Sequence, residues 1–430
     1  MTVGYELFNG CETVFETPDD GFSYFFGYYD KSPLNDTNDK LLAHRVAFDG
    51  RPVKDGDTAE IGYFDLISNE FIKINETLAW NWQQGSQLQW LPSSNGEKVI
   101  YNDIEKGSFV SRIIDISSRE IKTIPSPIYV VHPNGKEALG INYERHYWCR
   151  DGYNYQNIKN SKWDKPSHVE DGIYHINLET GGVEQIIKIT DIIAHTPIPE
   201  FKESNNWLEH LMYNSNGSRF LFFHRWSKDE IDHSRVYIAN SKDGMDLQLL
   251  PDSRFYSHCC WKNNTELTIW TYPPKKSNIN ITKVTSKIDR NGFIYQSAKY
   301  VVNLFSHKYK QKIKSKLIQQ SCLINFTDHS DAQTYIGNDT LYGNGHQTWN
   351  EDKNQLLLDT YQDENNYRKL MLFNNSSNNL TILGKFNSTY NDSEFRCDLH
   401  PRYSFDKQFI VIDSAHKSSR KLMVLRVPNV

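Results

Sequence analysis

Four histidines recur at one position of a repeated pattern, and their side chains are the groups best able to do chemistry in this chain. Each is followed three residues later by an aromatic residue, and the pairs are His210 with Tyr213, His258 with Trp261, His346 with Trp349 and His400 with Tyr403. Gln87, ahead of Trp90, occupies the same position in an earlier repeat. Neutral imidazole is a common ligand of transition metals and a good proton-transfer group near neutral pH. The pattern therefore indicates a metal site, a proton-transfer site or both.

Seven similar segments carry these residues. Each has an apolar or aromatic approach, a short turn rich in Asn, Asp or Gly and an apolar strand, and they span 28–46, 86–103, 127–143, 208–226, 256–272, 344–361 and 397–413. Such turns accept positive φ angles, so each segment predicts a β-hairpin. A second strand pair follows most of them, for example at 60–74 and 172–187. Two hairpins per repeat make a four-stranded antiparallel unit, and seven units predict an all-β, seven-bladed β-propeller.

The predicted propeller takes up residues 1–430 as a single domain, with insertions near 144–171 and 273–335. The last repeat has only three strands, so we expect a strand near 4–8 or 12–16 to supply the fourth and close the ring. Two separate β-sandwiches are the alternative. They would need a linker near the middle of the chain, and no stretch rich in Pro, Gly and Ser provides one.

The propeller fold predicts where the histidines lie. The first strand of each blade lines the central channel, so equivalent positions in neighbouring blades face one another around the axis. The four histidines should therefore converge at one mouth of the channel. Any one of them could be a packed repeat residue, but four titratable rings in one cleft are costly unless they bind a ligand such as a metal or an anion.

Basic and aromatic side chains are expected at the same mouth. The 144–171 insertion joins the second and third strands of blade 3, although it could also be a solvated lid with no ligand. Arg225 ends a second strand, so we expect it near the histidines as a catalytic residue that pairs with a substrate carboxylate. Arginine binds carboxylates in a bidentate manner, and tyrosine stacks on sugar rings. The predicted substrate-binding residues are Gln87, Arg145, Tyr147, Tyr153, Arg396 and Arg402.

The composition excludes several classes of partner. The 48 Lys and Arg residues nearly balance 53 Asp and Glu residues, for a net charge of −5, which argues against nucleic acid. No apolar run approaches about 18 residues, so no membrane span is expected. The first residues lack a basic start followed by an apolar core, and the six cysteines include no Cys-x-x-Cys pair. Reduced thiols in a cytoplasmic protein are therefore predicted.

The repeat architecture and the histidine segments resemble the oligogalacturonate lyase family, which are cytoplasmic seven-bladed propellers. The segments that carry the resemblance are Glu-His-Leu-Met-Tyr, Ser-His-Cys-Cys-Trp, Gly-His-Gln-Thr-Trp and Asp-Leu-His-Pro-Arg-Tyr-Ser. The resemblance implies a divalent metal, manganese first and zinc or calcium as alternatives, bound by His258, His346 and His400, with His210 as the base. The family has His-Pro-His where this chain has His400-Pro401-Arg402, and its glutamine ligand has only Gln87 and Gln347 as candidates. The segments at 26–33 and 396–402 are also similar to those of uncharacterised bacterial propeller proteins.

The chemistry that fits these residues is β-elimination. A base removes the C5 proton of a uronic acid, and the oxygen linked to C4 is expelled. A metal ion and arginine can neutralise the carboxylate that otherwise keeps this proton weakly acidic. Glycoside hydrolysis would need two facing carboxylates, and no such pair recurs in register with the repeat. The sequence therefore predicts a lyase of uronate-containing oligosaccharides, and the alternative is a non-catalytic propeller that binds glycans or proteins.

Overall fold

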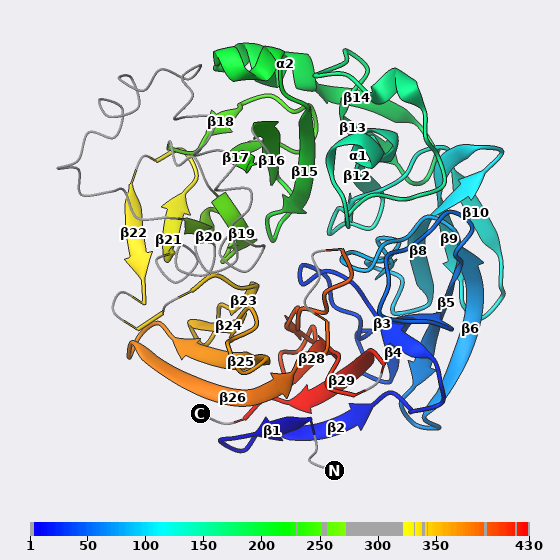
Figure 1. The fold of residues 1–430 in the computed structure, drawn as a ribbon, viewed down its shortest axis with the longest axis vertical. Helices are drawn as coiled ribbons and strands as arrows, with labels where there is room; N and C mark the ends of the chain where they lie inside the picture. Colours follow the sequence, from blue (N-terminus) through cyan, green and yellow to red (C-terminus); the bar gives the residue numbers. More distant parts are fainter. Residues whose placement is uncertain are drawn as a thin grey trace, which may run out of the picture.

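A computed structural model describes residues 4–228, 231–251, 256–271, 321–330, 332–337, 340–341, 343–390, 394–417 and 419–428. Its strands form seven antiparallel sheets arranged as blades around one axis (Figure 1). The fold is therefore the predicted seven-bladed β-propeller.

The first four blades follow the chain in order. Blade 1 contains β3 (Ser23–Phe25), β4 (Lys40–Val46), β5 (Ala59–Asp65) and β6 (Glu70–Thr77). Blade 2 contains β7 (Gln89–Trp90), β8 (Lys98–Glu105), β9 (Ser108–Asp115) and β10 (Ile121–Ile124). Blade 3 contains β11 (Val130–Val131), β12 (Glu137–Ile141), β13 (Gly172–Asn177) and β14 (Val183–Lys188). Blade 4 contains β15 (Asn206–Tyr213), β16 (Arg219–Lys228), β17 (Ile231–Asn240) and β18 (Gln248–Leu249).

The last three blades include the chain's N-terminal strands. Blade 5 contains β19 (Tyr256–Trp261), β20 (Glu266–Thr271), β21 (Cys322–Thr327) and β22 (Gln333–Ile336). Blade 6 contains β23 (Gln347–Asn350), β24 (Gln355–Asp359), β25 (Tyr367–Asn374) and β26 (Asn379–Asn387), with β1 (Tyr5–Leu7) as a fifth, outermost strand. Blade 7 contains β27 (Arg402–Tyr403), β28 (Phe409–Ser414) and β29 (Lys421–Arg426), with β2 (Glu12–Glu16) on its outer edge.

The blades hold together because their middle strands are apolar on both faces. Leu356, Leu357 and Leu358 follow one another on β24 and are all 0% exposed. Alternate side chains of a strand point to opposite faces. Leu357 accordingly packs with residues of blade 7, whereas Leu356 and Leu358 pack with residues of blade 5. Each blade is thus held between its two neighbours, which fixes the inner strands around the axis.

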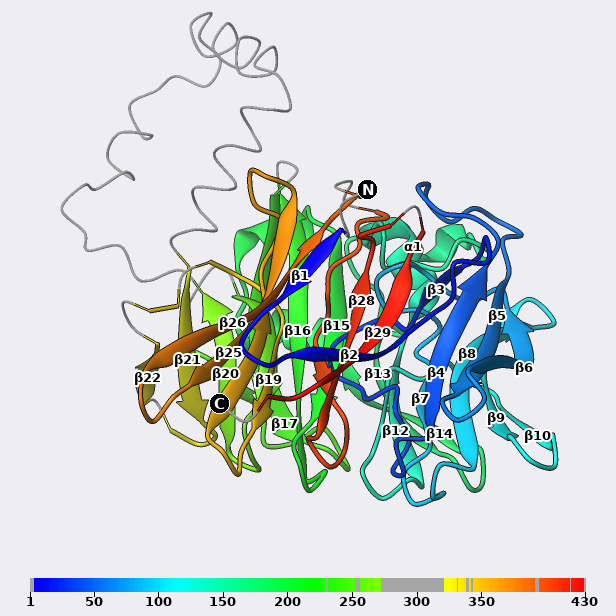
Figure 2. The same ribbon diagram turned by 90° about the horizontal axis from the view of Figure 1, so that it is seen from below.

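One insertion brings helical structure to the face that carries the predicted site. Between β12 and β13 the chain forms α1 (Tyr143–Cys149) and the short 3-10 turn η1 (Ser161–Trp163). In Figure 2, α1 lies at one end of the blades, on a flat face of the disc. Two elements that the sequence analysis did not predict, α2 (Ile189–His195) and the 3-10 turn η2 (Pro199–Lys202), connect blades 3 and 4.

The second predicted insertion extended too far towards the C-terminus. Residues 322–327 and 333–335 of the predicted range 273–335 lie in β21 and β22 of blade 5. Both strands pair in antiparallel register with their neighbours. Most of the remaining range, 273–320, lies outside the described residues. No helix among the described residues is long and apolar enough to cross a membrane.

The ring is closed by β2, as predicted for the segment near residues 12–16. β2 pairs antiparallel with β29, with Glu12 opposite Arg426 and Glu16 opposite Met423. The carboxylate of Glu16 also lies 3.4 Å from Nε2 of His416 and forms an ion pair with Lys417. Burial raises the pKa of Glu16, but the bonds to His416 and Lys417 outweigh it and lower the pKa from 4.5 to about 2.

This closure predicts an acid-sensitive contribution to stability. A lowered folded-state pKa stabilises the protein above the ordinary value and loses that effect as pH falls from about 4.5 to about 2. Glu16→Gln should therefore lower both the melting temperature and the free energy of unfolding at pH 7. The loss of free energy should be less than about 1 kcal/mol, because the ion pair is partly exposed. The difference from wild type should shrink as pH falls from about 4.5 and disappear below about 2. Glu12→Gln on the same strand is the control, and a difference that stays constant with pH would contradict the assignment.

Candidate metal and proton-transfer site

Three of the four predicted histidines lie in contact at the axis. His258 comes from β19, while His346 and His400 come just before β23 and β27. The ring centroids of His258 and His346 are 4.0 Å apart, and those of His346 and His400 are 4.2 Å apart. The three side chains thus come from blades 5, 6 and 7, and the inner edges of these blades bring them together.

Asp359, at the end of β24, holds two of these histidines in place. Its carboxylate accepts the backbone N–H of His346 at 2.7 Å and that of His400 at 3.1 Å. It also lies 3.0 Å from Nδ1 of His346. A carboxylate at Nδ1 favours the tautomer with a proton on that nitrogen, which leaves the lone pair on Nε2. Asp359 therefore orients His346 as a carboxylate orients a metal-binding histidine.

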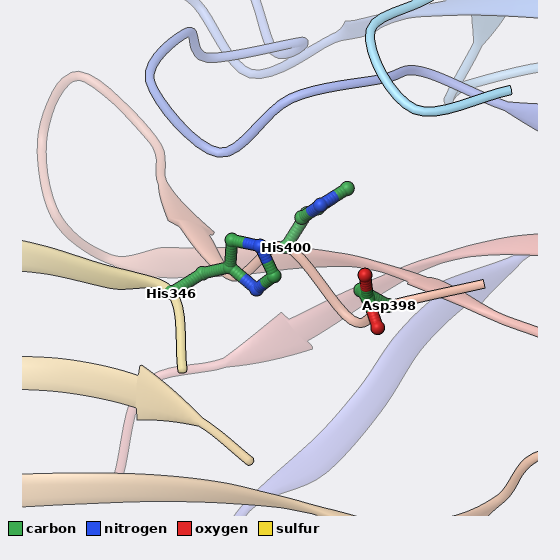
Figure 3. Close-up of side chains that lie close together, drawn as sticks. All are labelled: His346, Asp398 and His400. Carbon is green, nitrogen blue, oxygen red and sulfur yellow. The ribbon is translucent and has the colours of Figure 1, made fainter. Parts of the chain in front are cut away.

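The remaining nitrogens of this cluster fit a metal ion. Nε2 of His346 and Nε2 of His400 are buried and have no hydrogen-bond partner among the described residues. One ligand atom from each of His346, Asp398 and His400 lies within 4.8 Å of the others (Figure 3). Burial is the main reason that the pKa values of His258 and His400 fall well below the ordinary value, so both rings are neutral and can donate a lone pair.

Asp398 is already paired with two arginines. Its carboxylate lies 2.6 Å from Nη1 of Arg368 and 2.6 Å from Nε of Arg396. Burial raises its pKa, but the two guanidinium groups hold the pKa well below its usual range. Asp398 is therefore ionised, and its charge is balanced by arginine. We regard the three imidazoles as better ligand candidates than this carboxylate.

His210 lies apart from the other three histidines. The ring of Tyr28 stands between them, with its centroid 5.1 Å from that of His210 and 5.2 Å from that of His400. The Tyr28 hydroxyl lies 3.5 Å from Nε2 of His210. Burial lowers the pKa of His210 to about 3, so the ring is neutral at neutral pH and can accept a proton.

Three of the five residues at the repeat position have an unusual backbone conformation. Gln87, His210 and His400 have φ angles of 57°, 55° and 45°, in the left-handed region that non-glycine residues seldom adopt. At His210 the pairing of β15 with β16 is shifted between Glu209 and Met212. Strained residues of this kind persist where the surrounding fold fixes them, and they are common at functional sites.

A loop of blade 1 supplies two tyrosines that the sequence analysis did not assign to the site. Tyr28 and Tyr29 follow Gly27, and both rings contact His346 and His400. Tyr29 donates its hydroxyl to the carbonyl of Cys259 at 2.7 Å and accepts the Cys259 N–H at 2.9 Å. The loop thus reaches across the axis and ties blade 1 to blade 5. The only signal in the sequence was the segment 26–33 itself.

Arg402 holds this loop. Its Nε donates to the carbonyl of Tyr28 at 2.8 Å, and its Nη2 bonds the Gly27 carbonyl and the carboxylate of Asp413. The side chain is only 1% exposed. The sequence analysis placed Arg402 among the substrate-binding residues, but these bonds give it a supporting position beneath the tyrosines.

Arg145 also has its donors committed elsewhere. Its guanidinium is 1% exposed and bonds the carbonyls of Asn206, Trp163 and Pro166, which anchors the insertion to blade 4. The buried cation therefore has the role of a cross-link, and we leave it out of the proposed substrate site. The sequence analysis placed Arg145 in the 144–171 insertion as a substrate-binding residue and did not predict this burial.

The remaining predicted residues divide between the site and its surroundings. Tyr153 packs edge-on against His210, with ring centroids 6.2 Å apart, and accepts a hydrogen bond from Arg396 at 2.8 Å. Tyr147 instead contacts Trp148 and Lys159 of its own insertion.

The two glutamines are buried and bonded within the protein. Gln87 donates to Oε1 of Gln84 at 3.2 Å. Gln347 donates to the carbonyl of His258 at 2.8 Å, and its Oε1 has no hydrogen-bond partner among the described residues. Of the two glutamines, only Gln347 is shown here to bond a residue of the histidine cluster.

The fold and the site together define a class of protein: a seven-bladed β-propeller with buried histidines at its axis. No family model and no curated protein matches the sequence. Among solved structures, an oligogalacturonate lyase in complex with manganese is similar over 99% of this chain and 96% of its own, with a TM-score of 0.63 and 14% identity. The oligogalacturonate lyase of Vibrio parahaemolyticus matches over 100% of this chain and 98% of its own, with a TM-score of 0.62 and 13% identity. The resemblance predicted from the sequence is thus confirmed as a likeness of fold.

The histidine cluster predicts selective metal binding. Wild-type protein should bind about one manganese ion per chain, and His258→Ala, His346→Ala and His400→Ala should each bind it at least 100-fold more weakly. His210→Ala should bind as wild type does, because Tyr28 separates it from the cluster. Isothermal titration calorimetry with elemental analysis measures both quantities. Equal manganese affinity in all four variants would show that manganese does not bind at this site.

Asp359→Asn tests the orientation of the ligands. Asparagine matches the shape of aspartate but cannot accept every bond that the carboxylate accepts, so manganese affinity should fall about 10–100-fold. Circular dichroism checks that the fold is kept. Asp363→Asn, in the turn that follows, is the matched control. Unchanged manganese affinity in Asp359→Asn would show that the carboxylate does not orient the ligands.

Proposed function

We propose that this protein is a metal-assisted lyase that cleaves uronic-acid-containing oligosaccharides by β-elimination. The observation that carries the proposal is the pair of buried Nε2 atoms on His346 and His400 without hydrogen-bond partners among the described residues. A neutral histidine, His210, lies on the other side of Tyr28, and arginines are paired with Glu209 and Asp398. The likeness in fold to two oligogalacturonate lyases, one solved with manganese, supports the proposal.

His346 and His400 would hold the metal, with His258 as the third ligand. We name manganese first, and zinc or calcium as alternatives. When bound, the ion would neutralise the carboxylate of a uronate and make the C5 proton more acidic. We place the activity in the cytoplasm, in keeping with six cysteines that are all free thiols.

His210 and Tyr28 have the protonation states that elimination needs. The neutral imidazole of His210 accepts the C5 proton, and the electrons of the C5–H bond form the C4–C5 double bond as the C4–O bond breaks. Burial raises the pKa of Tyr28 well above its ordinary value, so its hydroxyl stays protonated and can donate to the leaving oxygen. Two neighbouring groups with oppositely shifted pKa values are a typical acid–base pair.

Three arginines provide the positive charge for a substrate carboxylate. The side chains of Arg150 and Arg396 are 19% and 17% exposed, and both guanidinium groups lie against the ring of Tyr153. Arg225 lies deeper, with 10% exposure, in an ion pair with Glu209. Arg150 and Arg396 are therefore the arginines that an entering carboxylate meets first.

The burial of the histidines favours a second candidate function. His346 is 0% exposed and His400 is 3% exposed, and closed metal sites are more often structural than catalytic. In that case the protein is a non-catalytic propeller whose metal stabilises the fold. Removal of the metal would then lower the melting temperature of a protein that has no lyase activity.

Formation of a 4,5-unsaturated product separates the two candidates. Protein loaded with manganese should produce a rise in near-ultraviolet absorbance from oligogalacturonate or another uronate oligosaccharide, and a chelator should abolish it. Substrates of each uronic acid and a neutral oligosaccharide complete the panel. If no acidic oligosaccharide yields the unsaturated product, the lyase proposal fails.

His210→Ala should lose turnover while keeping the metal. A positioned proton-transfer group contributes about 10²–10⁴-fold, so kcat should fall by that factor. His132→Ala is the control, because the ring of His132 also packs on β15, against Tyr213, the last residue of that strand. Full activity in His210→Ala with manganese bound would show that another residue is the base.

A further inference from the structure

The backbone of β15 brings two consecutive side chains to the same place. Neighbouring residues of a regular strand point to opposite faces. At His210 the positive φ of 55° and the shifted pairing with β16 break this alternation. Glu209 and His210 therefore meet, with Oε1 of the carboxylate 3.3 Å from Nε2 of the imidazole.

Glu209 is almost completely buried and contacts several donors. It is 1% exposed. Its Oε2 accepts from Nε of Arg150 at 3.0 Å and from the indole N–H of Trp207 at 3.3 Å, while Oε1 forms an ion pair with Arg225. Burial raises the pKa of Glu209, but Arg150 and Arg225 hold the pKa well below its usual range. The carboxylate is therefore ionised.

The other side of the His210 ring shows which nitrogen carries the proton. The Tyr129 hydroxyl lies 3.4 Å from Nδ1. That hydroxyl already accepts from the side-chain amide of Gln84 at 2.7 Å and from the backbone N–H of His210 at 3.1 Å. With both lone pairs used, its hydrogen can only be donated, and Nδ1 is the acceptor beside it. The proton of the neutral ring then sits on Nε2, which lies 3.3 Å from Oε1 of Glu209, an oxygen without a hydrogen-bond partner among the described residues.

We propose that Glu209 is the positioning residue of the site: it keeps the proton of His210 on Nε2, leaves Nδ1 as the accepting nitrogen, and fixes Arg150 and Arg225 towards the substrate. This inference rests on the proposed function. When His210 takes up a proton at Nδ1, the adjacent carboxylate balances the new charge without moving. The Nδ1 contact with Tyr129 is long, as hydrogen bonds of catalytic groups often are before the substrate binds.

Charge separates this role from a merely structural one. Glu209 carries one negative charge between two guanidinium groups. Its replacement by neutral glutamine keeps the shape of the side chain and raises the net charge of the site by one. An acidic oligosaccharide should therefore bind as tightly as before or more tightly, while proton transfer slows. Loss of a structural support would instead weaken binding and turnover together.

The test is Glu209→Gln, measured by steady-state kinetics and by nitrogen-15 NMR of labelled histidine. We expect kcat to fall about 10–100-fold, the range seen for residues that orient a functional group, with KM unchanged or lower. The His210 signal, assigned by its absence in His210→Ala, should change from the Nε2–H towards the Nδ1–H tautomer. Glu209→Asp, which keeps the charge, should recover part of kcat. Glu144→Gln is the control, because Glu144 also accepts an indole N–H, from Trp163.

The outcomes separate this inference from the proposed function. In Glu209→Gln, the whole loss of kcat/KM could come from a higher KM while the His210 tautomer stays unchanged. That result would show that Glu209 has only a structural role and would overturn the inference. Wild-type protein that yields no unsaturated product would overturn the lyase proposal, and the catalytic use of Glu209 with it. The tautomer in wild type and in Glu209→Gln would still decide, without turnover, whether Glu209 orients His210. If Glu209→Gln does not fold, Glu209→Asp alone must keep the wild-type His210 tautomer, and a change of that tautomer overturns the inference.

Discussion

The carboxylate of Asp359 is the interaction on which the centre of this molecule depends. It accepts the backbone N–H groups of His346 and His400, which belong to different blades, and bonds the imidazole of His346 as well. One buried anion thereby fixes the distance between two rings and the direction of a lone pair. A buried carboxylate without such donors would be costly, so the three bonds and the conformation of the two histidines support each other.

The rest of the architecture keeps this arrangement rigid. Apolar contacts on both faces of each blade determine where the inner strands lie, and β2 closes the ring so that blades 7 and 1 cannot separate. Arg402 and Asp413 then hold Tyr28 and Tyr29 against the histidines. Glu209 and Asp398 are each paired with two arginines. One arginine of each pair, Arg150 or Arg396, contacts the ring of Tyr153. The histidines are thus surrounded by fixed charges and rings, which is the preorganisation that electrostatic catalysis requires.

The repeat explains why so much of the fold could be predicted. Short turns rich in Asn, Asp or Gly and apolar strands recur along the chain because each blade has the same packing requirement, and Asn95 and Gly96 do have the positive φ angles, 52° and 70°, of such a turn. The same period places His258, His346 and His400 on equivalent inner strands. The C-terminal limit of the second insertion was missed because the strands of blade 5 at 322–336 are weakly patterned, with exposed residues along β22.

The supporting residues could not be predicted, because they lie outside the period. Asp359 ends a second strand, Tyr28 belongs to a loop, and Glu209 faces His210 only because of an irregularity in β15. Arg145 and Arg402 have side chains suited to binding a carboxylate ligand, yet both guanidinium groups donate hydrogen bonds to backbone carbonyls. Residue type alone does not show burial, so an arginine that cross-links loops and one that binds substrate are alike in the sequence.

The central claim is that His346 and His400 direct their Nε2 atoms, which have no hydrogen-bond partner among the described residues, at a common metal ion. Anomalous X-ray diffraction at the manganese edge, on crystals grown with manganese, tests it most directly. The account predicts one strong peak about 2.0–2.3 Å from Nε2 of both histidines, with His258 as the next ligand. A peak bound only by surface carboxylates, or no peak at the axis when the protein is saturated with manganese, would contradict it.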